Sequence, residues 1–350
     1  MSLFRKPPIR LYDLSATYVP SSGPRNRRLH LALSGGVLLL LLAVLWVELS
    51  TKEHLDELWQ AFLRQLQRAN WYWFFGAFLL VPLNWLAETR KWHQIIREYE
   101  PMSIWRALQA VWIGVCFSLF TPNRVGEYGG RILLVRPENR WKAVIANIVG
   151  NYGQLLVLLT VGLWGAGVFL NRLGISESGW YAPAGWILAL VLLVLYFLYF
   201  NIGILMPLAR RIALPRRLQF FRKEIQVLQH FNRYELSGIL GWAAIRYVVY
   251  ATQYFLLLRF FGINPDFTAG YAGIATIFLV QTSLPLPPLA GLVARGNLAV
   301  QAWAFFGANE ISSLAATFTL WIINLILPAL IGTFSLFYVN IAKLPAHEDD

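Results

Sequence analysis

The stretch FSLFTPNRVGEYGGRILLVRPENR, residues 117–140, decides how this chain folds. It interrupts an apolar run, 103–136, with prolines, glycines and ionisable side chains. Pro122 is expected to end a helix, because proline lacks an amide proton and its ring clashes with the preceding turn. The glycines that follow, beginning with Gly126, permit two backbones to approach closely. An apolar run broken in this way predicts a helical hairpin that enters a membrane and leaves on the same side.

A second apolar run, 268–306, is broken in the same manner by QTSLPLPPLAGLVARGNLAVQAWAFFG, residues 281–307. Pro285, Pro288 and Gly291 mark the expected turn of this second hairpin. Each broken run is followed by a long uninterrupted one. A hairpin plus a span, repeated in opposite orientation, is typical of inverted-repeat transporters, whose substrate site lies near the middle of the bilayer between the broken helices.

The amino-acid composition is typical of an integral membrane protein. Of the 350 residues, 57% are hydrophobic and 14% are charged, which is too apolar for a soluble globular domain of this size. The net charge of +12 suggests nucleic-acid binding, but the cations lie beside hydrophobic runs, where the positive-inside rule places them. No nucleic-acid partner is therefore expected. The single cysteine, Cys116, excludes a disulfide within the chain and a cysteine metal cluster.

Uninterrupted apolar runs predict six full crossings of the membrane. About 20 apolar residues span roughly 30 Å of hydrocarbon. The segment 52–68 instead separates apolar from charged side chains, which predicts an amphipathic helix in the membrane interface. No small-residue cleavage site follows the first run, so we expect that run to be retained as an anchor. The expected spans are 29–49, 71–91, 143–169, 182–206, 236–260 and 312–339.

The positions of the cations predict the orientation. The segment 1–28, the stretch around Lys91 and the loop 208–233 are basic, so the positive-inside rule places them in the cytoplasm. If only one broken run crossed fully, this loop would fall outside, and both runs are therefore expected to turn back. The sequence thus predicts an all-α integral membrane protein with about six full transmembrane helices and two opposed re-entrant hairpins forming an inverted repeat. A single membrane domain, 29–340, is followed by a short tail, 341–350, with both termini in the cytoplasm.

Ionisable side chains within the expected membrane segments mark the candidate substrate site. A charge at membrane depth costs several kcal/mol, so it should face a cavity or a partner of opposite charge. Glu127 either closes a self-satisfied clamp with its neighbouring arginines or leaves one of them free for an anion. Arg295 is the only charge of the second hairpin and either snorkels or binds an anionic ligand. Arg246 lies near the centre of its span, where snorkelling is hardest, and we expect it to line a polar cavity.

Polar side chains of the span 143–169 complete this candidate site. Asn147, Asn151 and Gln154 share one face, where they either line the cavity or bond neighbouring helices. Arginine forks next to half-helix N-termini suit an anionic group such as phosphate. A membrane lipid with an anionic head group is therefore the expected partner. The substrate-binding candidates are Arg124, Glu127, Arg131, Asn151, Arg246 and Arg295.

The sequence offers no catalytic constellation. Its five histidines fall in loops or near span ends with no two at ligand spacing, which disfavours a zinc or histidine-dependent enzyme. The acidic residues are scattered rather than clustered for magnesium, and no Walker A loop is present. We therefore expect neither a metal nor another cofactor, and no enzymatic activity.

Three segments, in this order along the chain, carry a resemblance to a known family. They are AETRKWHQII at 87–96, TPNRVGEYGGR at 121–131 and LPLPPLAGLVARGNLAVQAWAFFG at 284–307. Together they resemble the lysylphosphatidylglycerol synthase transmembrane family, the flippase-like domain of multiple-peptide-resistance proteins. The family's second motif often carries a glutamate just after its glycines, where this chain has Val293, Ala294 and Arg295. The residues that match the two motifs are Pro122, Gly126, Glu127, Arg131, Pro285, Pro288 and Gly291.

The resemblance implies translocation of a lipid. The substrate would be an anionic or aminoacylated phospholipid, or a polyprenyl-phosphate lipid carrier, moved across the bacterial cytoplasmic (inner) membrane. The chain ends soon after its last span, so the aminoacyl-transferase domain of the synthases is not expected. Two alternatives stay open: a membrane enzyme that modifies a lipid head group with Glu127 as the base, and a non-transporting scaffold that recruits partners through loop 208–233. The oligomeric state is also open, a homo-oligomer included.

Overall fold

The computed structural model describes residues 55–119, 121, 125–172, 181–204, 224–283 and 288–338. Every regular element in those ranges is helical, which confirms the all-α prediction, and no strand occurs among them. The helices are α2 (Leu55–Gln67), α3 (Trp71–Leu79), α4 (Val81–Ile96), α5 (Ile104–Ser118), α6 (Gly126–Ile132), η2 (Pro137–Asn139), α7 (Arg140–Arg172), α8 (Tyr181–Phe200), η4 (Ile202–Ile204), η6 (Ile225–His230), α11 (Arg233–Phe260), α12 (Phe267–Ser283), α13 (Pro288–Ala304), α14 (Glu310–Trp321), η7 (Ile322–Ile326) and α15 (Leu327–Tyr338).

Several predictions made from the sequence lie outside these residues. They are the segment 1–28, the first span 29–49, much of the loop 208–233, the tail 341–350, and the candidates Pro122, Arg124 and Pro285.

Three described helices are long and apolar enough to cross a membrane, namely Pro137–Arg172, Pro183–Phe200 and Glu310–Leu336. They correspond to three of the expected spans. The expected span 71–91 is divided between α3 and α4, and α11, which covers 236–260, carries Arg246 near its middle. The total of six full crossings therefore stays a prediction.

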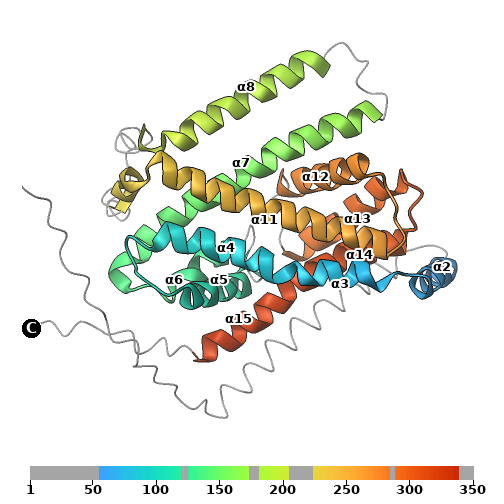
Figure 1. Cartoon of the computed structure of the whole chain (residues 1–350), viewed down its shortest axis with the longest axis horizontal. Coiled ribbons are helices and arrows are strands. Elements are labelled where there is room, and N and C mark those ends of the chain that lie inside the picture. Colours follow the sequence, from blue (N-terminus) through green and yellow to red (C-terminus); the bar gives the residue numbers. More distant parts are fainter. Residues whose placement is uncertain are drawn as a thin grey trace, which may run out of the picture.

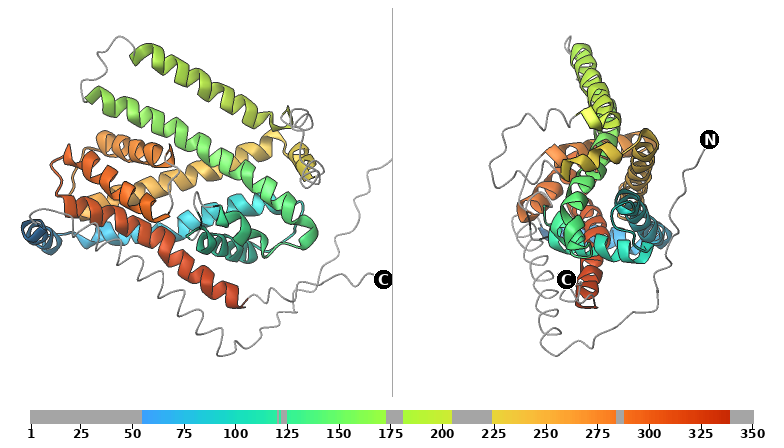
Figure 2. Two further views of the ribbon diagram at one scale, coloured as in Figure 1. Left: turned by 180° about the vertical axis from the view of Figure 1, so that it is seen from behind. Right: turned by 90° about the vertical axis from the view of Figure 1, so that its left-hand side faces the viewer.

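The two broken runs each form a pair of helices, and the pairs occupy different parts of the bundle. The α5–α6 pair lies toward one end, whereas the α12–α13 pair lies toward the other, as views from the front and from behind agree (Figures 1 and 2). The long helices α7 and α11 run between these ends (Figure 1). At the edge stands α8, whose apolar side chains Trp186, Leu190 and Leu193 are exposed. Such a surface suits contact with lipid.

Glycines allow the first pair to pack backbone against backbone. A Cβ atom on Gly130 of α6 would lie 2.6 Å from Cα of Gly114 on α5, which is far inside contact distance. A Cβ on Gly332 would likewise collide with the backbone of Trp112, so α15 also packs directly on α5. Small residues at crossing points are typical of helices that associate within a membrane.

The second pair packs against the remaining long helices. Along α12, Ala275 would lie 2.6 Å from a Cβ placed on Gly165 of α7, so these two helices also meet through small residues. Asp266 immediately precedes α12. Its Oδ1 accepts a hydrogen bond from the amide of Ala269 at 2.9 Å, and its Oδ2 accepts one from Nη1 of Arg172 at 2.8 Å. The Ala269 amide and the Arg172 guanidinium hold the pKa of Asp266 below its usual value.

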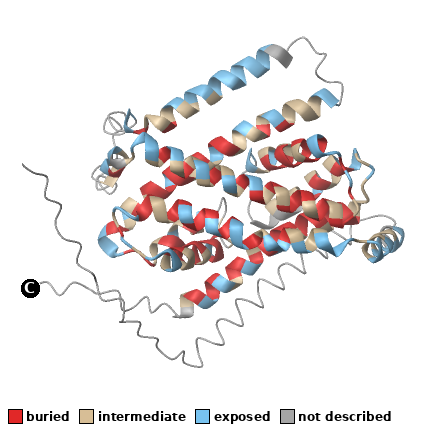
Figure 3. Ribbon diagram, in the orientation of Figure 1, coloured by how far each residue is buried: buried red, intermediate tan, exposed pale blue. Residues whose placement is uncertain are grey.

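The core follows the helices that meet in the centre of the bundle, where buried residues concentrate (Figure 3). Within it, the hydroxyl of Tyr254 on α11 lies 2.7 Å from Oγ1 of Thr317 on α14. The same hydroxyl accepts from Nε1 of Trp303 on α13 at 3.1 Å. Large aromatic side chains with satisfied polar atoms thus join three helices.

The amphipathic helix expected over 52–68 is present as α2. Trp59 and Leu63 are exposed, whereas Phe62 stacks on Phe261 with ring centroids 5.9 Å apart. The helix is therefore attached beside the end of α11 with part of its apolar surface uncovered. Its placement in the membrane interface stays a prediction.

Candidate functional site

One buried carboxylate, Glu88 of α4, is surrounded by three cations. Its Oε2 lies 2.8 Å from Nζ of Lys91 and 2.7 Å from Nη1 of Arg246 on α11. Its Oε1 lies 2.5 Å from Nη2 of Arg131 on α6. The side chains of Glu88, Lys91 and Arg131 are each only 1% exposed. Both carboxylate oxygens are therefore fully engaged by cations from three helices.

Arg131 extends this cluster to a second carboxylate and a fourth helix. Its Nη2 also pairs with Glu127, one turn earlier on α6, and its Nη1 donates to Oδ1 of Asn147 on α7 at 3.0 Å. The guanidinium lies over the ring of Trp92, 5.2 Å from its centroid. Arg131 with Glu127 therefore forms the clamp considered above. The cluster of Glu88, Lys91, Glu127, Arg131 and Arg246 holds three cations against two carboxylates.

Two members of this charge cluster were missed from the sequence. Lys91 was counted among the cytoplasmic cations, whereas the structure buries its side chain against Glu88. The side of the membrane on which this stretch lies stays a prediction. Both residues lie in the segment 87–96, near the expected end of a span, where charges are ordinarily solvated. Their spacing of three residues, which places them on one helix face, is the signal that could have paired them.

A cavity with a volume of about 450 Å³ lies beside the charge cluster. Its wall is built from the C-terminal end of α5, from α7 and α11, from the end of α12 and the beginning of α13, and from α14 and η7. It therefore lies where the ends of both broken helix pairs meet the long helices. The lining residues are Ser118, Leu119, Thr121, Gln154, Leu158, Arg246, Tyr247, Tyr250, Phe278, Gln281, Thr282, Gly291, Ala294, Arg295, Leu298, Trp321, Asn324 and Leu325.

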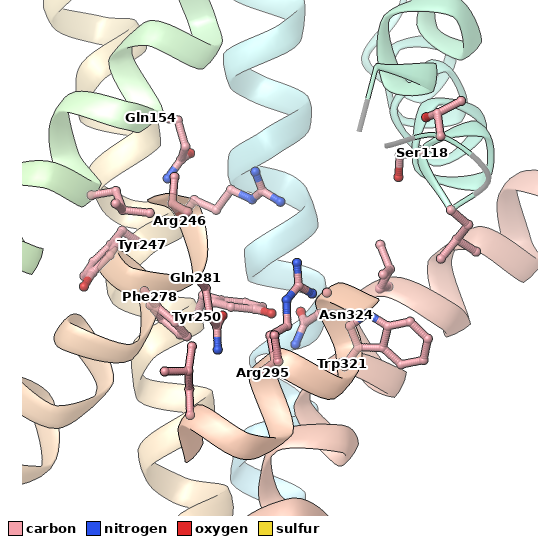
Figure 4. Close-up of a pocket in the computed structure, with 18 residues that line it drawn as sticks. Ser118, Gln154, Arg246, Tyr247, Tyr250, Phe278, Gln281, Arg295, Trp321 and Asn324 are labelled. Carbon is pink, nitrogen blue, oxygen red and sulfur yellow. The ribbon is translucent and has the colours of Figure 1, made fainter. Parts of the chain in front are cut away.

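Two arginines bring positive charge to this cavity. Arg246 links it to the charge cluster, because it bonds Glu88 while its side chain remains 18% exposed. Its guanidinium also lies 5.8 Å from the ring centroid of Trp85. Arg295 comes from α13, and the close-up shows it on the same cavity wall as Gln281 and Asn324 (Figure 4). The cavity thus joins a guanidinium from a long helix to one from the second helix pair.

An irregular turn supplies a further polar group. Asn324 lies in η7, a π-helical turn between α14 and α15, and lines the cavity. Its Oδ1 accepts from Nδ2 of Asn84 on α4 at 2.7 Å, and its Nδ2 donates to the carbonyl of Leu320 at 3.2 Å. Such turns occur frequently at functional sites. Asn324 was not predicted from the sequence, because nothing in an apolar run marks where a π-turn will form.

The predicted site residues divide between the two features. Arg246, Arg295 and Gly291 line the cavity, whereas Glu127 and Arg131 lie in the charge cluster. The candidate Asn151 lies at neither, because its Nδ2 donates to the hydroxyl of Tyr128 at 2.7 Å. Pro288 begins α13, and the amide of Gly126 donates to Oγ1 of Thr121 at 2.7 Å.

Long apolar helices, a buried ion cluster and a polar cavity define a multi-pass membrane protein. The chain belongs to the family described as the lysylphosphatidylglycerol synthase TM region, whose profile matches residues 31–332. The resemblance noted in the sequence is thereby confirmed, and the family places the chain among flippase-like membrane proteins involved in lipid handling. No curated protein matches this sequence.

Proposed function

We propose that this protein translocates a lipid with an anionic head group across the bacterial cytoplasmic membrane, with both termini in the cytoplasm. The observation that carries the proposal is the cavity that Arg246 and Arg295 line together. Guanidinium groups present forked N–H donors that match phosphate oxygens, and their hydrogen bonds to anions are stronger than neutral ones. The head group would occupy the cavity while the acyl or polyprenyl chains stay in the bilayer.

The arrangement of the helix pairs supports a transport mechanism. In this proposal the α5–α6 and α12–α13 pairs are re-entrant hairpins that enter from opposite membrane faces, as halves of an inverted repeat. Their positions toward opposite ends of the bundle agree with that arrangement (Figure 1). Residues from both pairs line the cavity, so rocking of one repeat against the other would open it to each side in turn.

The charge cluster gives Arg246 a fixed position in this mechanism. Glu88 holds one side of its guanidinium at 2.7 Å, and a guanidinium has further N–H donors for a ligand. The cations of the cluster outnumber its carboxylates, which favours an anion in the adjacent cavity. Glu127 as a catalytic base has less support, because its carboxylate pairs with Arg131 and it is not among the cavity-lining residues.

Translocation can be measured with purified protein in phospholipid vesicles. Dithionite added outside the vesicles bleaches only the fluorescent phosphatidylglycerol of the outer leaflet. The rate at which this bleachable fraction falls measures translocation to the inner leaflet and is compared between variants. We expect Arg295→Ala to slow translocation about tenfold or more, because a hydrogen bond to a charged group contributes about 1.5–3 kcal/mol. Arg246→Gln should act in the same direction. Arg233→Ala, an exposed arginine on the same helix as Arg246, is the matched control.

Three outcomes would count against the proposal. Unchanged rates in both cavity variants, with the protein still monodisperse, would show that the arginines do not handle the head group. A chemically altered lipid recovered from the vesicles would favour the enzyme alternative instead. A scaffold that acts through loop 208–233 predicts no translocation at all by the purified protein.

A further inference from the structure

The polar lining of the cavity has a composition that restricts the head group further. Apart from its two arginines, the polar side chains that line it are amides and hydroxyls, namely Ser118, Thr121, Gln154, Tyr247, Tyr250, Gln281, Thr282 and Asn324. We propose that the transported head group combines a phosphate with several hydroxyl groups, as in a sugar or polyol phosphate, and carries no amine. This inference rests on the proposed function and specifies the substrate class of the same cavity.

The first argument is the sign of the charge. No carboxylate occurs among the cavity-lining residues that the structure describes. The nearest acids in the cluster are already engaged: Glu88 contacts three cations and Glu127 pairs with Arg131. Among the described lining residues, an ammonium group would meet two guanidinium groups and no carboxylate.

The second argument is the chemistry of the uncharged groups. Amides and hydroxyls both donate and accept hydrogen bonds, which is what a ligand hydroxyl requires. Gln281, from the end of α12, lines the same part of the cavity as Arg295 and Tyr250 (Figure 4). The hydroxyl of Tyr247 is buried and has no hydrogen-bond partner among the described residues, which is uncommon for a native structure. A ligand hydroxyl would satisfy such a group.

The third argument is the shape of the lining. The rings of Tyr250 and Phe278 lie 5.3 Å apart, and with Trp321 they give the cavity flat apolar surfaces beside its polar groups. A sugar or cyclitol ring has the complementary surface, with C–H faces and a hydroxyl rim. The volume of about 450 Å³ falls in the usual range for small-molecule sites, so it admits a whole head group rather than a bare phosphate.

The test compares fluorescent lipids in vesicles that contain the whole protein. Phosphatidylinositol and phosphatidylglycerol carry hydroxyls, whereas phosphatidylethanolamine and lysylphosphatidylglycerol with the same tails carry amines. A polyprenyl phosphate bearing one hexose forms a separate arm, which distinguishes a glycerophospholipid from a polyprenyl carrier. We expect each hydroxyl-bearing class that is transported to move at least tenfold faster than both amine-bearing lipids.

A charge introduced into the cavity should change this selectivity. Gln281→Glu keeps the side-chain shape and adds a carboxylate, so we expect the rate ratio of phosphatidylinositol to phosphatidylethanolamine to fall about tenfold. Gln301→Glu makes the same change at an exposed position of α13 and should leave the ratio as it is. Native mass spectrometry identifies the lipids that each purified variant retains. Gln281→Glu should retain a larger share of amine-bearing lipids than the native protein, whereas Gln301→Glu should not.

The outcomes separate this inference from the proposed function. If amine-bearing lipids move as fast as the hydroxyl-bearing ones, or if Gln281→Glu leaves the ratio unchanged, the inferred substrate class is wrong although transport stands. If no lipid of any arm moves and native mass spectrometry finds none retained, the proposed function fails and the inference fails with it.

Discussion

Replacing Glu88 should destabilise the protein more than replacing its lysine partner, Lys91. Glu88→Gln removes a carboxylate that contacts Lys91, Arg131 and Arg246 together. Removing one partner of a buried ion pair costs about 3–5 kcal/mol, because an uncompensated charge remains. Since a native protein is stable by only about 5–15 kcal/mol, we expect this variant to lose a large part of its free energy of unfolding.

The charge balance of the cluster predicts a specific rescue. Glu88→Gln raises its excess of positive charge, and Lys91→Met in the same chain restores the original balance. The double variant should therefore be more stable than Glu88→Gln alone. Arg90→Met, at the exposed neighbouring position, should change the free energy of unfolding by less than about 0.5 kcal/mol.

Titration of the purified variants with sodium dodecyl sulfate in mixed micelles measures these free energies. Independent sites add to within about 0.3–0.5 kcal/mol, whereas members of one ion-pair network do not. If Lys91→Met adds its own destabilisation to that of Glu88→Gln, instead of reversing part of it, the described charge cluster does not account for how these residues are buried.

Three other features give predictions that the same preparations can test. Gly130→Ala should destabilise the protein by about 1–3 kcal/mol because its Cβ would collide with α5, whereas Gly129→Ala, with open space around it, should be neutral or stabilising; an equal effect of both would exclude the backbone contact. Asn324→Leu leaves buried Asn84 without its partner and should cost about 1–3 kcal/mol, with full stability arguing against this bond. The folded protein lowers the pKa of Asp266, so the ionised carboxylate stabilises the α7–α12 junction at any pH above the ordinary aspartate pKa of roughly 4. This stabilisation is lost as the pH falls through the folded-state pKa. Amide hydrogen exchange near α12 should therefore accelerate on acidification of the native chain but not of Asp266→Asn.

The sequence is informative where a residue would cost free energy in an ordinary membrane helix. A charge such as Arg246 in the middle of an apolar run must face a cavity or a partner, and the structure has Arg246 among the residues that line the cavity. Its role in binding a substrate stays a prediction. The prolines and glycines of the broken runs likewise predict two helix pairs, because those residues change the backbone itself. For Arg295 the sequence left two alternatives, snorkelling and binding of an anionic ligand. The structure has Arg295 among the residues that line the cavity.

The sequence is less informative where the outcome depends on three-dimensional packing. Glu88 and Lys91 look like the solvated end of a span, and only the fold shows that α6 and α11 bring arginines to them. Asn151 shares a helix face with Gln154, yet a contact with Tyr128 holds it away from the cavity wall. One face of a long helix contacts several neighbouring helices along its length. The surroundings of one residue on that face therefore do not predict those of the next residue on it.

The π-turn η7 also determines how the last long helix can be shared between two parts of the bundle. A π-turn takes up about one residue more than a regular α-helical turn, so each residue beyond it lies about 100° from the direction it would have in an uninterrupted α-helix. Upstream, α14 packs on α11 and α13, whereas downstream α15 presents Gly332 to α5. The turn therefore sets the phase between these two contact faces. If 322–326 formed regular α-helical turns with no residue removed, Gly332 would point about 100° away from α5, whereas loss of one residue from this turn would leave a regular helix that keeps both contact faces.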